Sequence, residues 1–492
     1  MGRDNVPIAR AVTCPVCGSL CDDIELRIKN RRIVKVKNGC SMCESKFLGY
    51  SGHRLLKPLI RKNGTLVEVP FKEALVKAAE VLAEADYPLL YGWSSTSCEA
   101  TRVGIELAEE VGGVIDNTST VCHGPSVLGI QDVGISSCTL GQIRHRADLV
   151  IYWGSNPWSA HPRHIERYTT LSEGKFERSE WRSYVTKTKA ATARKKVESA
   201  LRQVSPKKKF SIPSTPVERG PCPAILKAGR KLIVIDVRKT RTAEIADYFI
   251  QVEPNKDYEL LQAFRALIRD QEIETDKVAG VPVEYLEDVS DAMIGCNFGV
   301  IFFGLGLTMS KGKSRNVDAA LHLARDLNAR TKFVIMPMRG HFNVSGADTV
   351  FLWQTGYPYA VDFSSGYPRY NPGETSAIDV LLRKESDAAL VIGSDPVSNF
   401  PRKAAEHLVN NPLIAIDPHM NATSQMADIV FPSAFVGIET SGTAYRMDHV
   451  PLPLKKVVEP PRGVLPDEEI LRRLLLEVRK VKKRKKARAE VK

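Results

Sequence analysis

The sequence predicts an α/β protein built on parallel sheets, and two patterns support that prediction. Seven short apolar runs each end in a turn rich in Gly, Ser, Asn or Pro, and helical patterns fall between several of them. The runs are continuously apolar rather than alternating, which indicates strands buried on both faces. Since the chain has 492 residues, we expect two to four domains. Ligands are then expected at the loops that leave the carboxyl ends of the strands.

The expected elements are taken in chain order. The strand-and-turn runs are residues 88–96, 149–157, 232–240, 300–310, 333–339, 389–396 and 413–420. The clearest helical patterns are residues 72–85, 98–111, 258–269 and 317–328. Seven such loops could enclose one large ligand, but an ordinary α/β enzyme with one small crevice has the same pattern.

The formal net charge of +13 is concentrated in two stretches. Residues 172–222 hold thirteen Lys or Arg against five Asp or Glu, and residues 479–492 hold nine against one. We interpret the first as a basic surface excursion and the second as a basic tail, because charge runs are usually solvated. No aromatic residue is interleaved with the cations of the tail, so binding of nucleic acid is the less favoured interpretation.

Hydropathy predicts a cytoplasmic protein. The longest apolar run, residues 298–309, is well short of the roughly 20 residues that span a bilayer. Residues 1–12 lack the apolar core of a signal peptide. In that compartment the ten cysteines are expected as thiols or metal ligands rather than disulfides.

A cluster of cysteines near the N-terminus predicts an iron–sulfur centre. Cys14, Cys17 and Cys21 form a C-x2-C-x3-C run, and Cys40 and Cys43 follow after a hairpin-like stretch. Three thiolates close in sequence can hold one face of a [4Fe-4S] cubane, and a distant fourth ligand completes it. We favour Cys40 as that ligand, with Cys43 as the alternative. A zinc site and plain buried cysteines are the competing interpretations.

A second cysteine lies next to a histidine. Cys122 and His123 belong to the segment Val-Cys-His-Gly-Pro-Ser-Val at 121–127, just before an expected helix start. A thiolate there would be close to helix amide donors, which favour its ionised form. By itself the pair could equally be a buried thiol beside a packed histidine.

Taken together, the cysteine run, the segment 121–127 and the glycine-rich loops resemble the molybdenum or tungsten bis-pyranopterin oxidoreductases, formate dehydrogenases in particular. Four longer segments resemble the catalytic B subunits of formylmethanofuran dehydrogenase: residues 338–344, 355–363, 366–375 and 442–448. The resemblance covers roughly residues 13–467, apart from the basic excursion. It implies a multi-domain formate dehydrogenase-like fold, with Rossmann-like parallel-sheet domains and a small N-terminal iron–sulfur domain.

The resemblance implies roles for individual residues. Cys122 would ligate tungsten or molybdenum, for which a soft thiolate is suited. His123 would manage a proton or orient the carboxyl group. Arg238, in Ile-Asp-Val-Arg-Lys-Thr, would hold formate or CO2 with its guanidinium fork. Should Arg238 be only a surface residue, Arg339 and Arg369 are the alternatives.

The resemblance also implies which residues hold the cofactor, a tungsten or molybdenum bis-(molybdopterin guanine dinucleotide). Lys46 would lie between the iron–sulfur cluster and the pterin, and Asp257 would pair with a guanine edge. The cradling loops would contain Gly92 and Ser95, Gly154 and Asn156, Gly304 and Gly306, and Gly393 and Asp395. Glycine permits close approach of backbone amides to phosphate, although a structural turn is the usual reason for such a loop.

These expectations give a domain plan. An iron–sulfur domain at residues 1–60 is completed by about 436–478. One pterin-binding domain combines residues 61–150 and 345–435, and a second takes residues 151–344 with the basic excursion.

The implied function is reversible reduction of CO2 to formate, with electrons arriving through the cluster. Formate would pass to a separate metal-hydrolase subunit, the A subunit of the enzyme, for condensation with methanofuran in methanogenesis. Further partners would be a C-terminal-domain-like subunit covering the pterins and a polyferredoxin-type electron donor. The alternatives are a free-standing formate dehydrogenase and a redox-inactive B-like scaffold of a formyltransferase/hydrolase complex.

Overall fold

The structure, a computed structural model, describes residues 7–172 and 230–490 in two compact units. Unit 1 comprises Met1–Val121 and His341–Lys492, and unit 2 comprises Cys122–Gly340. The expected basic excursion lies outside the described residues except for Ser172. The first change of unit comes at 121/122, earlier than the expected boundary at 150. The reason is that α4 (Gly124–Val133) packs against α13 (Ser314–Leu327) of unit 2.

Unit 1 is built on a nine-stranded sheet whose centre is parallel. The strand order is β16 (Arg369–Tyr370), β15 (Val361–Asp362), β7 (Val114–Asn117), β6 (Pro88–Gly92), β17 (Ala388–Ile392), β18 (Leu413–Asp417), β19 (Ile429–Pro432), β4 (Leu59–Lys62) and β5 (Thr65–Glu68). Strands β7 to β19 are parallel, and antiparallel pairs close both edges. The central strands are buried along their length, as their continuous apolar sequence predicts.

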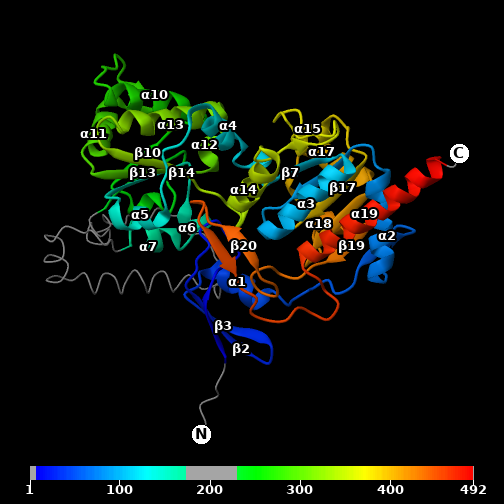
Figure 1. Cartoon of the computed structure of the whole chain (residues 1–492). Coiled ribbons are helices and arrows are strands. Elements are labelled where there is room, and N and C mark those ends of the chain that lie inside the picture. Colours follow the sequence, from blue (N-terminus) through cyan, green and yellow to red (C-terminus); the bar gives the residue numbers. More distant parts are fainter. Residues whose placement is uncertain (1–6, 173–229, 491–492) are drawn as a thin grey trace, which may run out of the picture. The chain divides into compact units, whose positions relative to one another are not determined.

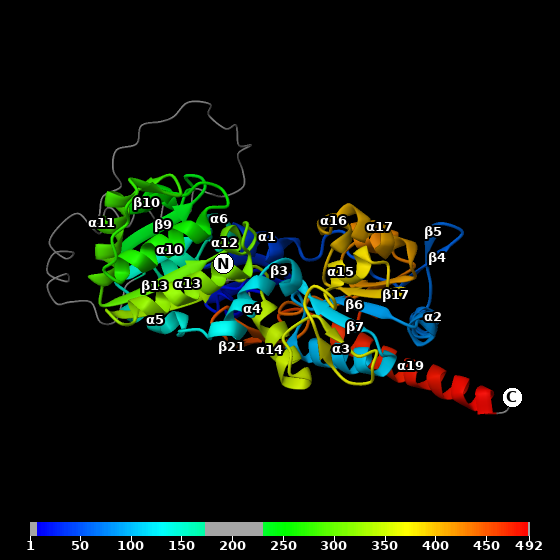
Figure 2. The same cartoon turned by 90° about the horizontal axis from the view of Figure 1, so that it is seen from above.

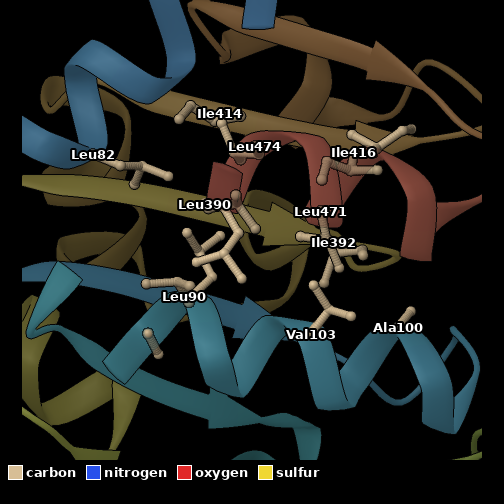
Figure 3. Packing of buried hydrophobic residues seen from close by; sticks show 14 of the residues in the cluster. Leu82, Leu90, Ala100, Val103, Leu390, Ile392, Ile414, Ile416, Leu471 and Leu474 are labelled. Carbon is tan, nitrogen blue, oxygen red and sulfur yellow. The ribbon is translucent and has the colours of Figure 1, made fainter. Parts of the chain in front are cut away.

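Three long helices, α2 (Phe71–Glu84), α3 (Cys98–Val111) and α19 (Asp467–Glu490), contribute to one core of unit 1. Figure 3 shows Ile392 of the sheet between Val103 of α3 and Leu471 of α19. A second core contains α15 (Ala377–Leu382) and α17 (Arg402–Asn410). The remaining helices of this unit are α14 (Val344–Thr355), α16 (Pro396–Asn399), α18 (Ala422–Met426) and the turn η1 (Thr118–Val121).

The expected basic tail is part of α19, and this corrects the sequence-based interpretation. The helix continues to Glu490, and in Figure 2 its last turns extend beyond α3. Val478 and Val481 are buried, and Arg479 pairs with Glu110 at 2.9 Å. The charge run is therefore the solvated face of an amphipathic helix whose other face reaches the core.

A small N-terminal layer completes unit 1. Strands β1 (Ile8–Val12), β2 (Ile24–Lys29) and β3 (Arg32–Lys37) form an antiparallel sheet, followed by α1 (Ser41–Gly49). Its core contains Phe47 together with Phe435 and Val458, which are distant in sequence. A hairpin of β20 (Gly442–Tyr445) and β21 (Pro451–Leu454) also belongs to this end of unit 1.

Unit 2 holds a five-stranded parallel sheet. Its order is β10 (Tyr248–Gln251), β9 (Lys231–Asp236), β8 (Leu149–Trp153), β13 (Phe298–Phe303) and β14 (Lys332–Pro337). Figure 1 shows α10 (Asp257–Ile268) and α13 on one side of this sheet, with α5 (Leu140–Arg146) and α7 (His164–Tyr168) on the other. The smaller elements are α6 (Pro157–Ala160), η3 (Ala243–Ile245), β11 (Lys277–Val278), β12 (Val281–Pro282), α11 (Val283–Ile294) and α12 (Leu305–Thr308).

The α/β fold with parallel sheets is thus confirmed. Each of the seven expected runs contains a strand, and each of the four expected helical patterns contains a helix. Local signals set several ends: α3 begins after Ser97, whose Oγ accepts the N–H of Ala100, and stops at Gly112 in the left-handed region. Among the described residues, no helix combines the length and apolarity that crossing a membrane requires.

Candidate functional site

The same turn follows a central strand in each unit. Gly154 follows β8 in unit 2 and Gly393 follows β17 in unit 1, with φ of +54° and +53°, a conformation that favours glycine. The N–H of Gly154 donates to Ile235 O at 2.8 Å, and that of Gly393 donates to Ile416 O at 3.0 Å. Both turns therefore lie at the carboxyl edge of a parallel sheet, each tied to the neighbouring strand.

Asn156 and Asp395 occupy the equivalent position of these two turns. Asn156 Oδ1 accepts a hydrogen bond from Thr242 Oγ1 at 2.7 Å, and Asp395 Oδ1 accepts one from Thr423 Oγ1 at 2.6 Å. Burial acts to raise the pKa of Asp395, but the hydrogen bonds from Thr423 and Ser398 outweigh it and lower that pKa. Both side chains fix the shape of their turn, and a cofactor contact by either remains a prediction.

The glycines of these loops are required by contacts between neighbouring loops. A Cβ on Gly92 would lie 2.0 Å from Ile392 O, and one on Gly306 would lie 2.6 Å from Gly154 Cα. A Cβ on Gly304 would meet Gly154 O at 2.6 Å. Ser95 faces the turn of Gly393, because a Cβ added to Gly393 would lie 3.4 Å from Ser95 Cβ. Packing between neighbouring loops of each unit is therefore enough to explain these glycines. Their role in holding phosphate stays a prediction.

Asp257 is buried at the first turn of α10. Its Oδ1 accepts a hydrogen bond from Trp153 Nε1 at 2.9 Å. Burial raises its pKa, against the hydrogen bonds from Trp153 and Ser310. The chain itself therefore already bonds this carboxylate through Trp153 and Ser310, and its pairing with a guanine edge stays a prediction.

The five N-terminal cysteines lie within electrostatic range of one another in unit 1. None of the five forms a disulfide bond with a described residue, and the Cys14 N–H donates to Cys21 O at 2.9 Å. A hydrogen bond with Cys43 and burial raise the pKa of Cys14, with further contributions from Cys21 and Cys17. Burial, then the Cys21 charge, raises the pKa of Cys17 to about 12, and Cys40 adds to this.

This thiol set fits the chemistry of a [4Fe-4S] cluster, which is typically held by four Cys thiolates. Cys43 contacts Cys14 directly, whereas Cys40 interacts with Cys17, so both candidates for the fourth ligand lie in the group. Within residues 7–172 and 230–490, no three His, Cys, Asp or Glu side chains converge as ligands of a single metal ion.

Lys46 lies beside the cysteines, as the resemblance implies. Its Nζ is 4.3 Å from the centroid of the Phe435 ring, and its charge interacts with Cys14. Burial lowers the pKa of Lys46 against the attraction of Asp417 and Cys14.

His123 is fully buried in unit 2, and the chain bonds both of its ring nitrogens. Nε2 lies 3.1 Å from Met338 O, so it carries the proton and donates, while Nδ1 accepts from Ser126 Oγ at 2.9 Å. Burial, then the Arg339 charge, lowers the pKa of His123 to about 3. His123 is therefore a neutral imidazole in a fixed orientation. The preceding Cys122 is half-buried, and its carbonyl accepts from Thr308 Oγ1 at 3.1 Å.

Two further residues join His123: Arg339, which sequence reasoning named only as an alternative to Arg238, and His161, which it did not assign. Arg339 is only 3% exposed and interacts electrostatically with His123. The buried His161 donates from Nε2 to Arg339 O at 2.7 Å, so two imidazoles hold the consecutive carbonyls of Met338 and Arg339. Arg339 belongs to a segment that the resemblance singled out, but no spacing signal marked His161.

Arg238 and Arg369 lie elsewhere on their units. Arg238 is exposed on the loop after β9, and its N–H donates to Asp236 Oδ1 at 3.2 Å. Arg369 is 38% exposed and donates to Glu374 Oε1 at 2.9 Å. Of the three arginines weighed from the sequence, Arg339 is the one that the structure brings to His123.

Sequence comparison identifies the relatives of the chain. A family model described as molybdopterin oxidoreductase matches residues 54–196 and 221–477. The chain is 46% identical over 479 residues to the B subunit of tungsten-containing formylmethanofuran dehydrogenase 2 from Methanocaldococcus jannaschii, covering 97% of this chain and 100% of that protein. It is 43% identical over 478 residues to the B subunit of the same enzyme from Methanococcus maripaludis, covering 96% and 100%. The alpha subunit of F420-dependent formate dehydrogenase 2 from M. maripaludis is 23% identical, covering 94% of this chain and 69% of that protein.

Solved structures show the same fold. A chain of the formyltransferase/hydrolase complex from Methylorubrum extorquens, determined with methylofuran, matches with a TM-score of 0.60 at 19% identity, covering 84% of this chain and 97% of that one. Acetylene hydratase from Pelobacter acetylenicus matches with a TM-score of 0.66 at 13% identity, covering 96% and 69%. From its family match and its full-length relatives, this chain is an oxidoreductase of the molybdopterin oxidoreductase family and belongs among the B subunits of formylmethanofuran dehydrogenase.

Proposed function

We propose that this chain is the catalytic subunit that interconverts CO2 and formate at a tungsten or molybdenum bis-pyranopterin centre. The observation that carries the proposal is Cys122 followed by a buried, neutral His123 that interacts with Arg339, in a chain 46% identical along its length to a tungsten-containing B subunit. A thiolate can ligate a soft metal, an imidazole can fix a proton, and a guanidinium can hold a carboxylate.

Cys122 would be the ligand that the chain supplies to the metal, through its thiolate. The metal–pterin group, when bound, would supply the two-electron chemistry. The G-S-N-P and G-S-D-P turns, at residues 154–157 and 393–396, would contribute backbone amides at the carboxyl edges of the two sheets.

An arginine would hold the carboxyl group, and His123 would position the backbone beside it. Because His123 uses Nε2–H for Met338 O and Nδ1 for Ser126, it is a fixed neutral group that positions the Met338–Arg339 backbone. Arg339 would offer its fork to a formate oxygen or to CO2. Arg238 keeps the substrate-holding role that the family resemblance implies, and the two arginines are separated by the test described in the Discussion.

Electrons would enter through a [4Fe-4S] cluster held by Cys14, Cys17, Cys21 and either Cys40 or Cys43. The mutual interaction of these thiols and the position of Lys46 beside Cys14 support this assignment.

The chain would act within a larger assembly. Formate would pass to the metal-hydrolase partner, the A subunit, for condensation with methanofuran, and a further subunit would cover the pterins. A polyferredoxin-type protein would deliver electrons. The relatives that are named as B subunits and the structural neighbour from a multi-subunit complex support this proposal.

The experiment replaces Cys122 by Ala in the purified complex and uses Cys138→Ala, another half-buried thiol of unit 2, as the matched control. We expect Cys122→Ala to abolish CO2/formate interconversion while iron content and folding stay unchanged, and Cys138→Ala to retain activity. Substantial formate oxidation by Cys122→Ala would refute the proposal. Absence of tungsten, molybdenum and iron from the wild-type complex would instead favour the scaffold alternative.

A further inference from the structure

We propose that Arg54, together with His419 and Lys46, forms an oxyanion site of the phosphate class around the Phe435 ring of unit 1. Arg54 Cζ lies 4.6 Å and Lys46 Nζ 4.3 Å from the ring centroid. The His419 ring packs edge-on against the same ring, with centroids 5.2 Å apart. Three nitrogen-bearing side chains thus gather on one apolar ring.

The guanidinium of Arg54 is buried and only partly satisfied. Its side chain is 4% exposed, and NH2 donates to Glu439 Oε2 at 2.8 Å and to Ser433 O at 3.0 Å. Nε and NH1 are buried and have no acceptor among the described residues. Unsatisfied buried donors are strongly unfavourable, and most severely so for a charged group. These N–H groups therefore require an acceptor that the described residues do not provide.

Nearby carboxylates are already engaged. Glu439 Oε2 accepts from Arg54 and also from the Phe435 N–H at 2.9 Å. Asp417 accepts from the His419 N–H at 2.9 Å, and Asp467 from Thr96 Oγ1 at 2.6 Å. None of the three carboxylates accepts a hydrogen bond from Nε or Nη1 of Arg54.

The location also fits a ligand site. Arg54 is paired as an isolated bridge with His419, which follows β18, while Ser433 follows β19. The group therefore lies at the carboxyl edge of the parallel strands of unit 1, where α/β folds bind ligands. The His419 ring has hydrogen bonds with the backbone of Gly52 and Tyr50, and its Nε2 is buried with no partner in hydrogen-bond geometry among the described residues.

The number of donors favours a multivalent oxyanion over a water molecule. Nε and NH1 of Arg54 offer three N–H groups, and the Lys46 ammonium adds more. One water oxygen accepts about two hydrogen bonds, whereas a phosphate presents several charged oxygens to a guanidinium fork. The oxyanion could come from a phosphate of the pterin dinucleotide or from free phosphate, and the experiment separates these sources.

The test measures binding of inorganic pyrophosphate to the full-length chain prepared without cofactor, by calorimetry and thermal shift. Arg54→Lys keeps a positive charge for Glu439 but loses the fork. Arg265→Lys is the matched control, because Arg265 is another largely buried arginine and donates its Nε to Asp326. We expect pyrophosphate to bind wild type and Arg265→Lys equally, and Arg54→Lys at least tenfold more weakly.

A second variant keeps the test decisive if Arg54→Lys does not fold. His419→Ala removes a partly exposed side chain and should also weaken pyrophosphate binding, with an unchanged circular dichroism spectrum. Equal binding by wild type, Arg54→Lys and His419→Ala would overturn the proposal, as would no binding by wild type, which would leave buried water as the acceptor.

Pyrophosphate binding to the cofactor-loaded complex distinguishes the two sources of the oxyanion. Loss of the pyrophosphate response on loading assigns the site to a cofactor phosphate, and Arg54→Lys should then also retain less pterin. A response that persists assigns it to free phosphate. Both results support an oxyanion site, and neither depends on turnover, so an active Cys122→Ala enzyme would leave this inference standing.

Discussion

Units 1 and 2 share a turn, and each also holds a buried nitrogen-bearing side chain, Arg54 in unit 1 and His123 in unit 2, whose hydrogen bonding differs. Gly154 and Gly393 begin near-identical turns, closed by Thr242 in one unit and Thr423 in the other. In unit 2 both ring nitrogens of His123 are bonded within the unit. In unit 1, by contrast, Nε and NH1 of Arg54 have no acceptor among the described residues.

The difference teaches which groups are organised before any ligand binds. Unit 2 holds the Met338–Arg339 backbone through two imidazoles, so its geometry is fixed by the chain and is suited to preorganised electrostatics. Unit 1 gathers the N-terminal thiols and an arginine with two buried nitrogens that have no acceptor among the described residues. Substitution of the unit 1 thiols should therefore change cluster content, and substitution of the unit 2 arginines should change turnover.

The largest effect is expected for the cysteines of unit 1. Cys14→Ser and Cys17→Ser each remove a soft thiolate ligand, so the electron paramagnetic resonance signal of the cluster should disappear while tungsten or molybdenum stays bound. Iron and metal analysis checks both statements. Recovery of zinc with no iron from the wild-type chain would show that the thiols hold another metal.

A sharper comparison within unit 1 sets Cys43→Ser against Cys40→Ser. Cys43 contacts Cys14 directly and is buried, whereas Cys40 is half-buried at the start of α1. One of the two variants should lose the cluster signal as Cys14→Ser does, and the other should keep it. The sequence favours Cys40, and this pair of variants decides between the two. Full signal in both variants would exclude either as the fourth ligand.

In unit 2 the arginines should affect turnover without changing cofactor content. Lysine keeps the charge but not the fork, so Arg339→Lys should lower formate turnover at least about tenfold, or about 1.4 kcal/mol in the barrier. Arg238→Lys should do the same if the family role holds, and the exposed Arg402→Lys serves as control. Unchanged turnover in Arg238→Lys alone would assign the carboxylate clamp to Arg339. Unchanged turnover in both would remove arginine from substrate binding.

The smallest effect is a pH dependence of stability from His161. Burial lowers its pKa, so below the unfolded value of about 6.5 the unfolded chain binds a proton that the folded chain does not. The stability is complete above that pH and decreases as pH falls, by up to about 1.4 kcal/mol per pH unit for one group. His161→Gln keeps a donor for Arg339 O and does not titrate, so its melting temperature should fall less between pH 7 and 5 than that of wild type or of the exposed control His53→Gln. Equal slopes in all three proteins would contradict this origin.

The sequence by itself determined where the strands lie and which cysteines lie close together along the chain. Continuous apolar runs such as 149–157 and 389–396 could only be buried, so their strands and following turns were predictable. Cys14, Cys17 and Cys21 are close in sequence, so their proximity followed from spacing. Short-range patterns report local structure, and they misled only for residues 479–490, where a charge run continues a helix.

Only the tertiary structure decided which distant residues meet. His161 and Arg339 are far apart in sequence, as are Arg54, His419 and Phe435, and no local periodicity relates them. The order of strands in each sheet brings their loops to a common edge, and burial then determines which polar atoms are bonded and which are not. Those long-range contacts made Arg339 a neighbour of His123, left Arg238 exposed, and left two nitrogens of Arg54 without an acceptor among the described residues.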